Sequence, residues 1–257
     1  MTIQTTQKTQ ISQNTLFNSL RSETTKLFSM RSTLVYAILL AGSLFGPVTL
    51  VGLFGDRPTF DWPTITYGYQ IFLLIAVIFA GATTAGDIRN HMHAQAFLTQ
   101  RGRWQWVASK MLVTAVLVAV LYLVGTALSL GVAAVLGSGT DLGTGLSMFY
   151  VPLICSALFS AMTVGLACVI RSQVAAVAVP VAWVLLIDGM VGFAAEQFEV
   201  LRPLAAIAPV QRQDQLISGI DPLGLGLSSA VCYLVIVAWF LVLAGVGLCR
   251  NSAADVR

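Results

Sequence analysis

Two histidines and an acid at close spacing are the first candidates for chemistry. His91 and His93 lie four and six residues after Asp87. On a helix, Asp87 and His91 share a face because residues four apart are neighbours, whereas His93 points about 200° away from His91. A zinc site takes three or four ligands, so two on one face are too few. The pattern favours polar residues on an exposed or partner-facing helix, and we expect no metal site here.

Motifs for nucleophilic or nucleotide chemistry are missing from the sequence. It contains no Gly-x-Ser-x-Gly turn and no His-Glu-x-x-His helix. A phosphate-binding loop needs a lysine directly after its glycines. The lysines of this chain are Lys8, Lys26 and Lys110, and none stands in such a motif. We therefore predict no catalytic residue, no cofactor bound by this chain and no nucleotide hydrolysis by the chain itself.

Composition places the chain in a membrane. Apolar residues make up 57% of the 257 residues and charged residues 10%, whereas soluble domains average about 45–50% and 25%. Five uncharged runs are each long enough for the roughly 20 residues that a spanning helix needs, and a sixth is broken only by Asp188. The runs are 32–55, 62–86, 111–140, 142–170, 172–195 and 222–249. They predict an all-α polytopic membrane protein with six transmembrane helices.

Asp188 is the one acid inside a predicted span, and two interpretations of it stay open. An ionised group at bilayer depth is costly and usually faces a cavity or a partner, so Asp188 could contact a proton or a substrate. It also lies shortly before Glu196, which puts it about 10 Å deep at most. We favour a structural role near the outer end of the span.

Positive charges predict the orientation. If the N-terminus is cytoplasmic and each run crosses once, 11 of the 14 Lys and Arg residues lie inside and only Arg57, Arg202 and Arg212 lie outside. Short loops rich in Lys and Arg stay on the cytoplasmic side. We therefore expect a multi-pass protein of the cell membrane with both termini cytoplasmic. The basic clusters flank apolar runs, which argues against a nucleic-acid partner.

The remaining segments complete the predicted architecture. Residues 1–14 are expected to be disordered, and 15–257 form a single transmembrane domain. An amphipathic pattern over 15–31 predicts a helix in the inner interface, and 88–98 predicts a short inner helix between the second and third spans. Pro152 and Pro180 each predict a local break in backbone hydrogen bonding, and short outer helices are expected at about 196–202 and 209–218. The spans are placed at about 33–54, 67–86, 111–136, 147–170, 174–194 and 226–249.

Two of these segments resemble the permeases of exporter-like "type 2" ABC transporters. The stretch before the first span resembles the family's elbow helix, with Glu23, Lys26 and Arg31 followed by Ser32. After the second span, Asp87 stands where the family often has Glu, and Lys110 matches a Lys that opens the third span. Thr99, Arg101 and Arg103 match a Thr-Pro-x-Arg motif, although Gln100 replaces the proline and a Gly-Thr pair is missing.

The resemblance implies a function and a set of partners. The 87–110 loop would be a coupling loop that contacts a separate ATPase subunit. Two copies of that ATPase are expected, and they would bind ATP and Mg²⁺. A second permease chain, identical or homologous, would complete a pathway for a lipid, peptide antibiotic or drug. The coupling residues implied are Asp87, Arg89, His91, His93, Phe97, Leu98, Arg101 and Arg103.

Two other classes of function stay open from the sequence. A stand-alone secondary carrier or channel would be favoured by buried charge pairs or inverted repeats, and the sequence shows neither clearly. A non-transporting membrane scaffold would be favoured if no ATPase accompanied the chain.

Overall fold

The computed structural model describes residues 17–55, 59–92, 103–137, 139–143, 145–170, 172–221 and 223–253. Within this part, six helices are long and apolar enough to cross a membrane, which confirms the predicted fold class. The fifth is composite and joins α8, a π-helical turn and α9. The six are α2 (Arg31–Phe54), α4 (Tyr69–Arg89), α6 (Arg103–Leu136), α7 (Ser147–Val169), α8 (Gln173–Ala182) with α9 (Asp188–Gln197), and α12 (Ser229–Ala253).

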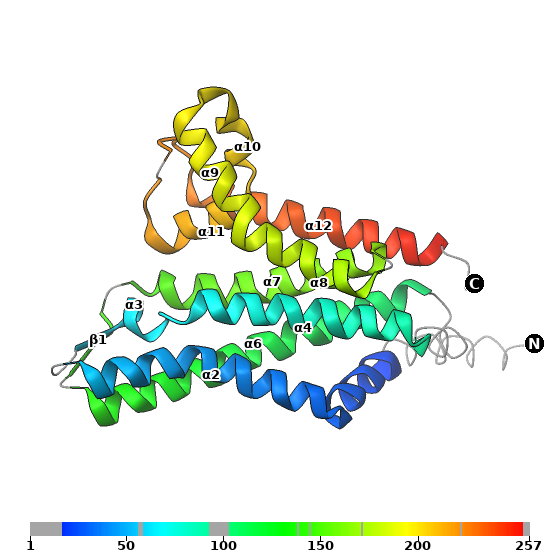
Figure 1. The fold of residues 1–257 in the computed structure, drawn as a ribbon, viewed down its shortest axis with the longest axis horizontal. Coiled ribbons are helices and arrows are strands. Elements are labelled where there is room, and N and C mark those ends of the chain that lie inside the picture. Colours follow the sequence, from blue (N-terminus) through cyan, green and yellow to red (C-terminus); the bar gives the residue numbers. More distant parts are fainter. Residues whose placement is uncertain are drawn as a thin grey trace, which may run out of the picture.

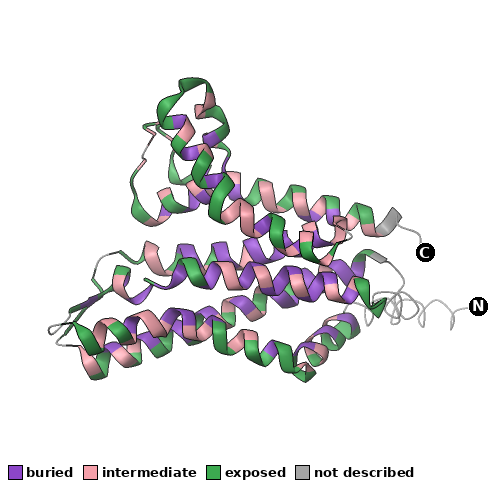
Figure 2. Ribbon diagram, in the orientation of Figure 1, coloured by how far each residue is buried: buried purple, intermediate pink, exposed green. Residues whose placement is uncertain are grey.

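The second and fourth spans form the centre of the bundle. About two thirds of the apolar part of α4 and α7 is buried, 61% and 67%, against 22% for α2 and 17% for the fifth span. Figure 2 shows buried residues concentrated on α4 and α7. The start of α2 and the end of α12 lie at one end of the bundle (Figure 1), which we call the predicted inner end. The opposite end is the predicted outer end.

Small residues let neighbouring helices approach closely at two crossings. A Cβ atom on Gly81 of α4 would stand 2.7 Å from the backbone oxygen of Ala176 in α8. A Cβ on Gly165 of α7 would stand 2.5 Å from the backbone oxygen of Leu243, and one on Gly247 would stand 2.7 Å from the oxygen of Gly165. In a membrane, helix association depends on such close packing because lipid removes the hydrophobic driving force.

The fifth span is broken where the sequence predicts it. Pro180 lies near the end of α8, and the π-helical turn Trp183–Ile187 follows directly. Proline removes a backbone donor and crowds the preceding turn, so the helix changes its winding there. At Pro152, which also lacks a backbone N–H to donate, α7 continues as a helix. In Figure 1, α9 then slants away from the bundle.

The first part of the connection between spans five and six, at the predicted outer end, is helical. It consists of a 3₁₀ turn (Glu199–Leu201), α10 (Arg202–Ala206) and α11 (Pro209–Ser218). The structure places α11 where a short helix was predicted, and Gly219 ends it in the left-handed conformation with a φ of 70°. The other short helix, predicted at about 196–202, begins a few residues later, because α9 runs to Gln197 and Pro203 favours the start of a new helix, α10.

Two short strands at the predicted outer end were not predicted. Strand β1 (Thr59–Asp61) pairs in parallel with β2 (Gly139–Asp141). The short helix α3 (Trp62–Ile65) follows, capped by Asp61, which accepts from the backbone N–H of Thr64 at 3.0 Å and from its hydroxyl at 2.6 Å. The hydrogen bond from the Thr64 side chain holds the pKa of Asp61 below its usual value. Asp61 therefore stays ionised as a cap.

The segments around the predicted inner helices are described in part. A helix over residues 17–29 precedes α2, and the chain is extended at Met30. The second span continues to Arg89, and His91 follows with a φ of 53°. Most of the helix predicted at 88–98 lies outside the described residues.

Candidate functional site

Four charged side chains form a buried cluster at the predicted inner end. Asp87 Oδ2 lies 2.6 Å from Lys26 Nζ and 2.8 Å from Lys110 Nζ. Lys110 Nζ also lies 3.6 Å from Glu23 Oε2, and the indole N–H of Trp106 donates to Glu23 Oε1 at 3.1 Å. The side chain of Lys110 is 1% exposed and that of Asp87 is 4% exposed. We call Glu23, Lys26, Asp87 and Lys110 the charge cluster.

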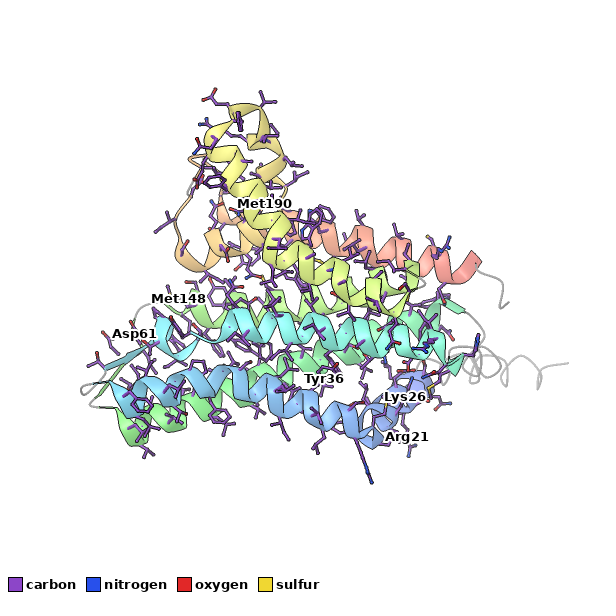
Figure 3. The ribbon with its side chains drawn as sticks, viewed as in Figure 1. Arg21, Lys26, Tyr36, Asp61, Met148 and Met190 are labelled. Carbon is purple, nitrogen blue, oxygen red and sulfur yellow. The ribbon has the colours of Figure 1, made fainter. Side chains whose placement is uncertain are left out.

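Three helical segments position the charge cluster. The helix over 17–29 supplies Glu23 and Lys26, which share a face because they are three residues apart. The last turn of α4 supplies Asp87. The first turns of α6 supply Trp106 and Lys110, again on one face because they are four apart. Figure 3 shows Lys26 at this end of the bundle, beside α4.

The balance of opposite charges stabilises the cluster in the protein interior and connects its helices firmly. Burying an ion costs several kcal/mol, and the cost is offset only if opposite charges and hydrogen bonds surround it. Here two cations meet two anions, so the buried group has no net charge. Asp87 and Lys110 stand on either side of the segment that connects α4 to α6. Both ends of that segment are therefore held to the helix that leads into the first span.

The structure separates the residues predicted for the coupling loop. Asp87 is turned into the protein, so its carboxylate pairs within the chain rather than facing outward. Arg89 is exposed and donates to Gln173 Oε1 at 3.1 Å, which links the end of α4 to the start of α8. His91 is exposed, and Arg103 is the first residue of α6. Four of the predicted residues lie outside the described part of the chain: His93, Phe97, Leu98 and Arg101.

The predicted elbow residues also lie in two different environments. Glu23 and Lys26 belong to the charge cluster, whereas Arg31 is exposed at the start of α2. Lys110 and Trp106 were not among the predicted site residues. The signal for Lys110 was its position, since a lone lysine at the head of an apolar run needs a buried partner.

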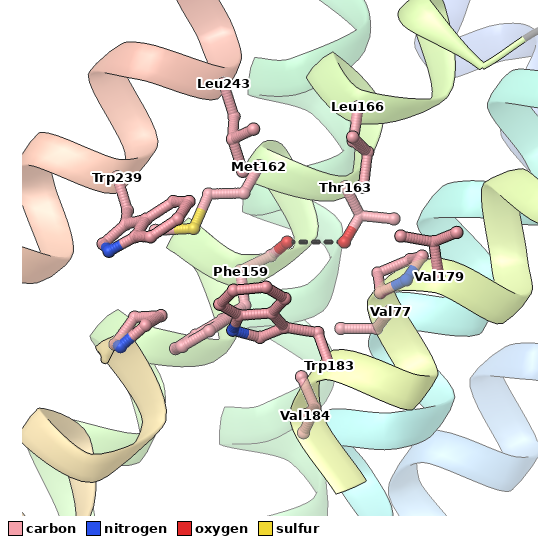
Figure 4. Close-up of a pocket in the computed structure, with 12 residues that line it drawn as sticks. Val77, Phe159, Met162, Thr163, Leu166, Val179, Trp183, Val184, Trp239 and Leu243 are labelled. Carbon is pink, nitrogen blue, oxygen red and sulfur yellow. Dashed lines mark hydrogen bonds between the residues drawn. The ribbon is translucent and has the colours of Figure 1, made fainter. Parts of the chain in front are cut away.

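An apolar pocket lies deeper in the bundle, among spans two, four, five and six. Its cavity measures about 220 Å³. Figure 4 shows Phe159 and Met162 of α7 among its lining residues, together with two tryptophans, Trp183 and Trp239. Their ring centroids are 5.6 Å apart. The lining residues are Val77, Phe159, Met162, Thr163, Leu166, Val179, Pro180, Trp183, Val184, Pro209, Trp239 and Leu243.

Asp188 is buried at the junction of the fifth span and α11. It is 1% exposed, and its Oδ2 accepts from the backbone N–H of Gln211 at 2.8 Å. Gln211 lies in the first turn of α11, where backbone N–H groups have no partner within the helix. The carboxylate therefore caps α11 and holds it against the fifth span.

The described residues contain no grouped metal ligands, and the similarity to known proteins identifies the family of the chain. Within the described residues, no three His, Cys, Asp or Glu side chains are grouped so that they could hold a metal ion. No curated protein matches the chain. Residues 101–256, more than half of the chain, match the family model described as "ABC-2 family transporter protein". The chain therefore belongs to the ABC-2 family and is a multi-pass membrane protein, the permease component of an ABC transporter.

Proposed function

We propose that the chain is the membrane subunit of an ATP-driven exporter, and that it couples to a separate ATPase through the segment between α4 and α6. Membership of the family implies an ABC ATPase partner in general. ATP and Mg²⁺ would bind to that partner. The permease would turn the partner's movement into movement of its spans.

The charge cluster is the observation that carries the proposal. A loop can transmit force to the helices only if its two ends are firmly attached to them. Here Asp87 and Lys110 attach the two ends of this segment to the helix over 17–29. That helix leads directly into α2. Force applied to the loop would therefore reach the first span through buried ion pairs. Arg89 and His91 are exposed at the same end of the bundle.

Exposed apolar helices support a pair of permeases. The first and fifth spans are among the least buried, and both carry large exposed apolar residues. Such faces meet either lipid or another transmembrane helix. We propose that two permease chains, identical or homologous, meet along these spans. A hydrophobic or amphipathic substrate would cross between them.

Co-purification tests the coupling. The tagged chain, extracted in mild detergent from its native host, is expected to carry an ABC ATPase with vanadate-sensitive hydrolysis. Replacing Arg101 and Arg103 with Glu should release the ATPase, because reversed charges oppose the contact. The matched control is Arg202→Glu, which changes a partly exposed arginine in the outer connection and should leave the ATPase bound.

Each result bears on the proposal. Loss of the ATPase with the double variant, with normal membrane insertion and a normal control, supports coupling through this loop. Undiminished association would remove the loop from the coupling role. A clean preparation that never carries an ATPase would favour a stand-alone carrier instead.

A further inference from the structure

A second cavity lies at the predicted inner end, between the helix over 17–29 and α6. It measures about 320 Å³. Three of its residues on α6 are Leu112, Val116 and Val120, which follow one another at intervals of four and form one stripe. Each is 47–53% exposed, so the cavity is open along this side. We call it the interfacial groove, and its lining residues are Leu20, Thr24, Leu27, Phe28, Leu112, Val113, Val116, Leu117 and Val120.

The interfacial groove presents apolar surface to a ligand. Among its described lining residues only Thr24 is polar, and the Thr24 hydroxyl already donates to the backbone oxygen of Arg21 at 2.9 Å. Phe28 lines the groove and is 81% exposed in the chain alone. Large apolar side chains that are exposed together mark a surface that meets lipid or a partner rather than water. A hydrocarbon chain therefore fits the lining of this groove.

The length of the interfacial groove corresponds to one leaflet of a bilayer. From Leu112 to Val120 the axis of α6 advances about 12 Å, and half of the hydrocarbon core of a bilayer is about 15 Å. The groove also begins beside the charge cluster, because Val113 lies three residues after Lys110 and Leu27 directly follows Lys26. It therefore runs from the level of the buried charges toward the middle of the third span.

An exposed cation stands at the edge of the groove. Arg21 lies three residues before Thr24 and seven before Phe28, so it shares a side of the helix with both lining residues. It is only about 4.5 Å from Thr24 along the helix axis. Among the described residues no carboxylate forms an ion pair with Arg21, whereas Lys26 of the same helix is paired with Asp87. Figure 3 shows Arg21 and Lys26 at this end of the bundle.

We propose that the interfacial groove binds an anionic phospholipid. One acyl chain would lie between the helix over 17–29 and α6, and the lipid phosphate would accept hydrogen bonds from Arg21. Amphipathic helices at a membrane interface gain both from buried apolar surface and from anionic headgroups, and arginine pairs with phosphate through two parallel hydrogen bonds. The bound lipid would hold the helix that carries Glu23 and Lys26 against α6. Binding requires neither transport nor an ATPase.

Photo-crosslinking tests the site with two matched lipids. The purified chain is placed in phosphatidylcholine nanodiscs that contain a small fraction of a probe lipid with a diazirine in the middle of one acyl chain. The probe is either phosphatidylglycerol, which is anionic, or phosphatidylcholine with the same chains. Mass spectrometry then locates the labelled residues. The anionic probe should label Phe28, Leu112 and Val116 about fivefold more than the neutral probe, which is the contribution of one basic residue at a membrane surface.

Three variants test the contribution of charge. Arg21→Gln should bring labelling of the groove by the two probes to about the same level, because the headgroup contact is lost. Arg21→Lys keeps the charge and should keep most of the preference for the anionic probe. Arg250→Gln is the matched control, since it removes an exposed arginine of α12, and it should leave the preference unchanged.

Two further variants test the contribution of shape. Val116→Phe fills the groove and should lower labelling of Phe28 and Leu112 by both probes. Val116 is 53% exposed, so the larger side chain is directed at the groove rather than at the core. Val135→Phe makes the same change at an exposed valine of α6 outside the groove and should alter neither signal.

Specific results would overturn the proposal. Equal labelling of the groove by both probes in the unmodified chain would show that it takes any lipid. A preference that survives Arg21→Gln would exclude Arg21 as the headgroup contact, and no labelling of the groove would show that another occupant excludes lipid. If a variant does not stay monodisperse, competition in the unmodified chain decides, because unlabelled phosphatidylglycerol must displace the anionic probe better than phosphatidylcholine does. The proposed coupling to the ATPase stands or fails separately.

Discussion

At the scale of single residues, the charge cluster is held together by its balance. Asp87 contacts both lysines, and Glu23 contacts Lys110 and the indole of Trp106. Removing one anion leaves two cations facing a single carboxylate in a site that water barely reaches. The loss is therefore larger than the worth of one hydrogen bond, because the remaining charge stays buried without its partner.

We expect Asp87→Asn to lower the free energy of unfolding by about 3–5 kcal/mol. Unfolding in detergent micelles, followed by tryptophan fluorescence, measures the change. The matched control is Glu199→Gln, which breaks an exposed pair with Arg202 at 3.3 Å and should cost about 1 kcal/mol or less. Equal effects of the two variants would show that the cluster contributes no more than a surface ion pair.

The sequence singled out three members of the charge cluster, but it did not predict that they contact one another. Glu23, Lys26 and Asp87 were selected through a resemblance, but Asp87 was expected to face a partner. That it faces Lys26 and Lys110 depends on how the helix over 17–29 folds back onto α4 and α6, which no local pattern contains. Arg212 was counted as an outer loop cation for the same reason, since its burial arises from the packing of α11.

At the scale of elements, apolar length predicted the six spans because lipid requires unbroken helices of that length. The ends differ by a few residues; the second span, for example, continues to Arg89 instead of ending at residue 86. The strands β1 and β2 were not predicted because each has only three residues, which is too few to show the alternation of apolar and polar residues typical of a strand. The π-helical turn escaped it as well, although Pro180 predicted a break nearby.

We predict opposite effects for two glycines in α12. A Cβ on Gly247 would stand 2.7 Å from the backbone oxygen of Gly165, whereas one on Gly245 would meet nothing within 4 Å. Gly247→Ala must push α12 away from α7 and should cost about 1–3 kcal/mol. Gly245→Ala should be neutral or stabilise by up to about 1 kcal/mol, because alanine favours the helix. The midpoint temperature of thermal unfolding measures the stability of each variant. Equal midpoints for the two variants would contradict the close crossing of α12 and α7.

At the scale of the whole molecule, burial falls from the centre of the bundle outward. The second and fourth spans form a core that most other helices pack against, while less than a quarter of the apolar part of the first, fifth and sixth spans is buried. Such a molecule is stable as a bundle but leaves wide faces for lipid and for partner helices. A second permease is expected on these faces rather than on α4 or α7.

We predict that the end of α12 faces the cytoplasm. Cys249 is exposed there, whereas Cys155 and Cys232 are buried. In a chain carrying Cys168→Ala, a membrane-impermeant maleimide should label Cys249 in inside-out vesicles and not in intact cells. Ser218→Cys, exposed at the opposite end, should react in intact cells. The reverse pattern would overturn the orientation predicted from the positive charges.

The π-helical turn Trp183–Ile187 sets the rotation of everything that follows it in the fifth span. Such a turn holds one residue more than an α-helical turn, so it acts as a single-residue insertion. Each residue advances a helix by about 100°, and α9 is therefore out of phase with α8 by about that angle. This phase shift brings Asp188 to the N–H of Gln211. Related chains whose fifth span is one residue shorter are expected to wind without interruption and to leave α11 uncapped, so a single gap in a sequence alignment would distinguish the two designs.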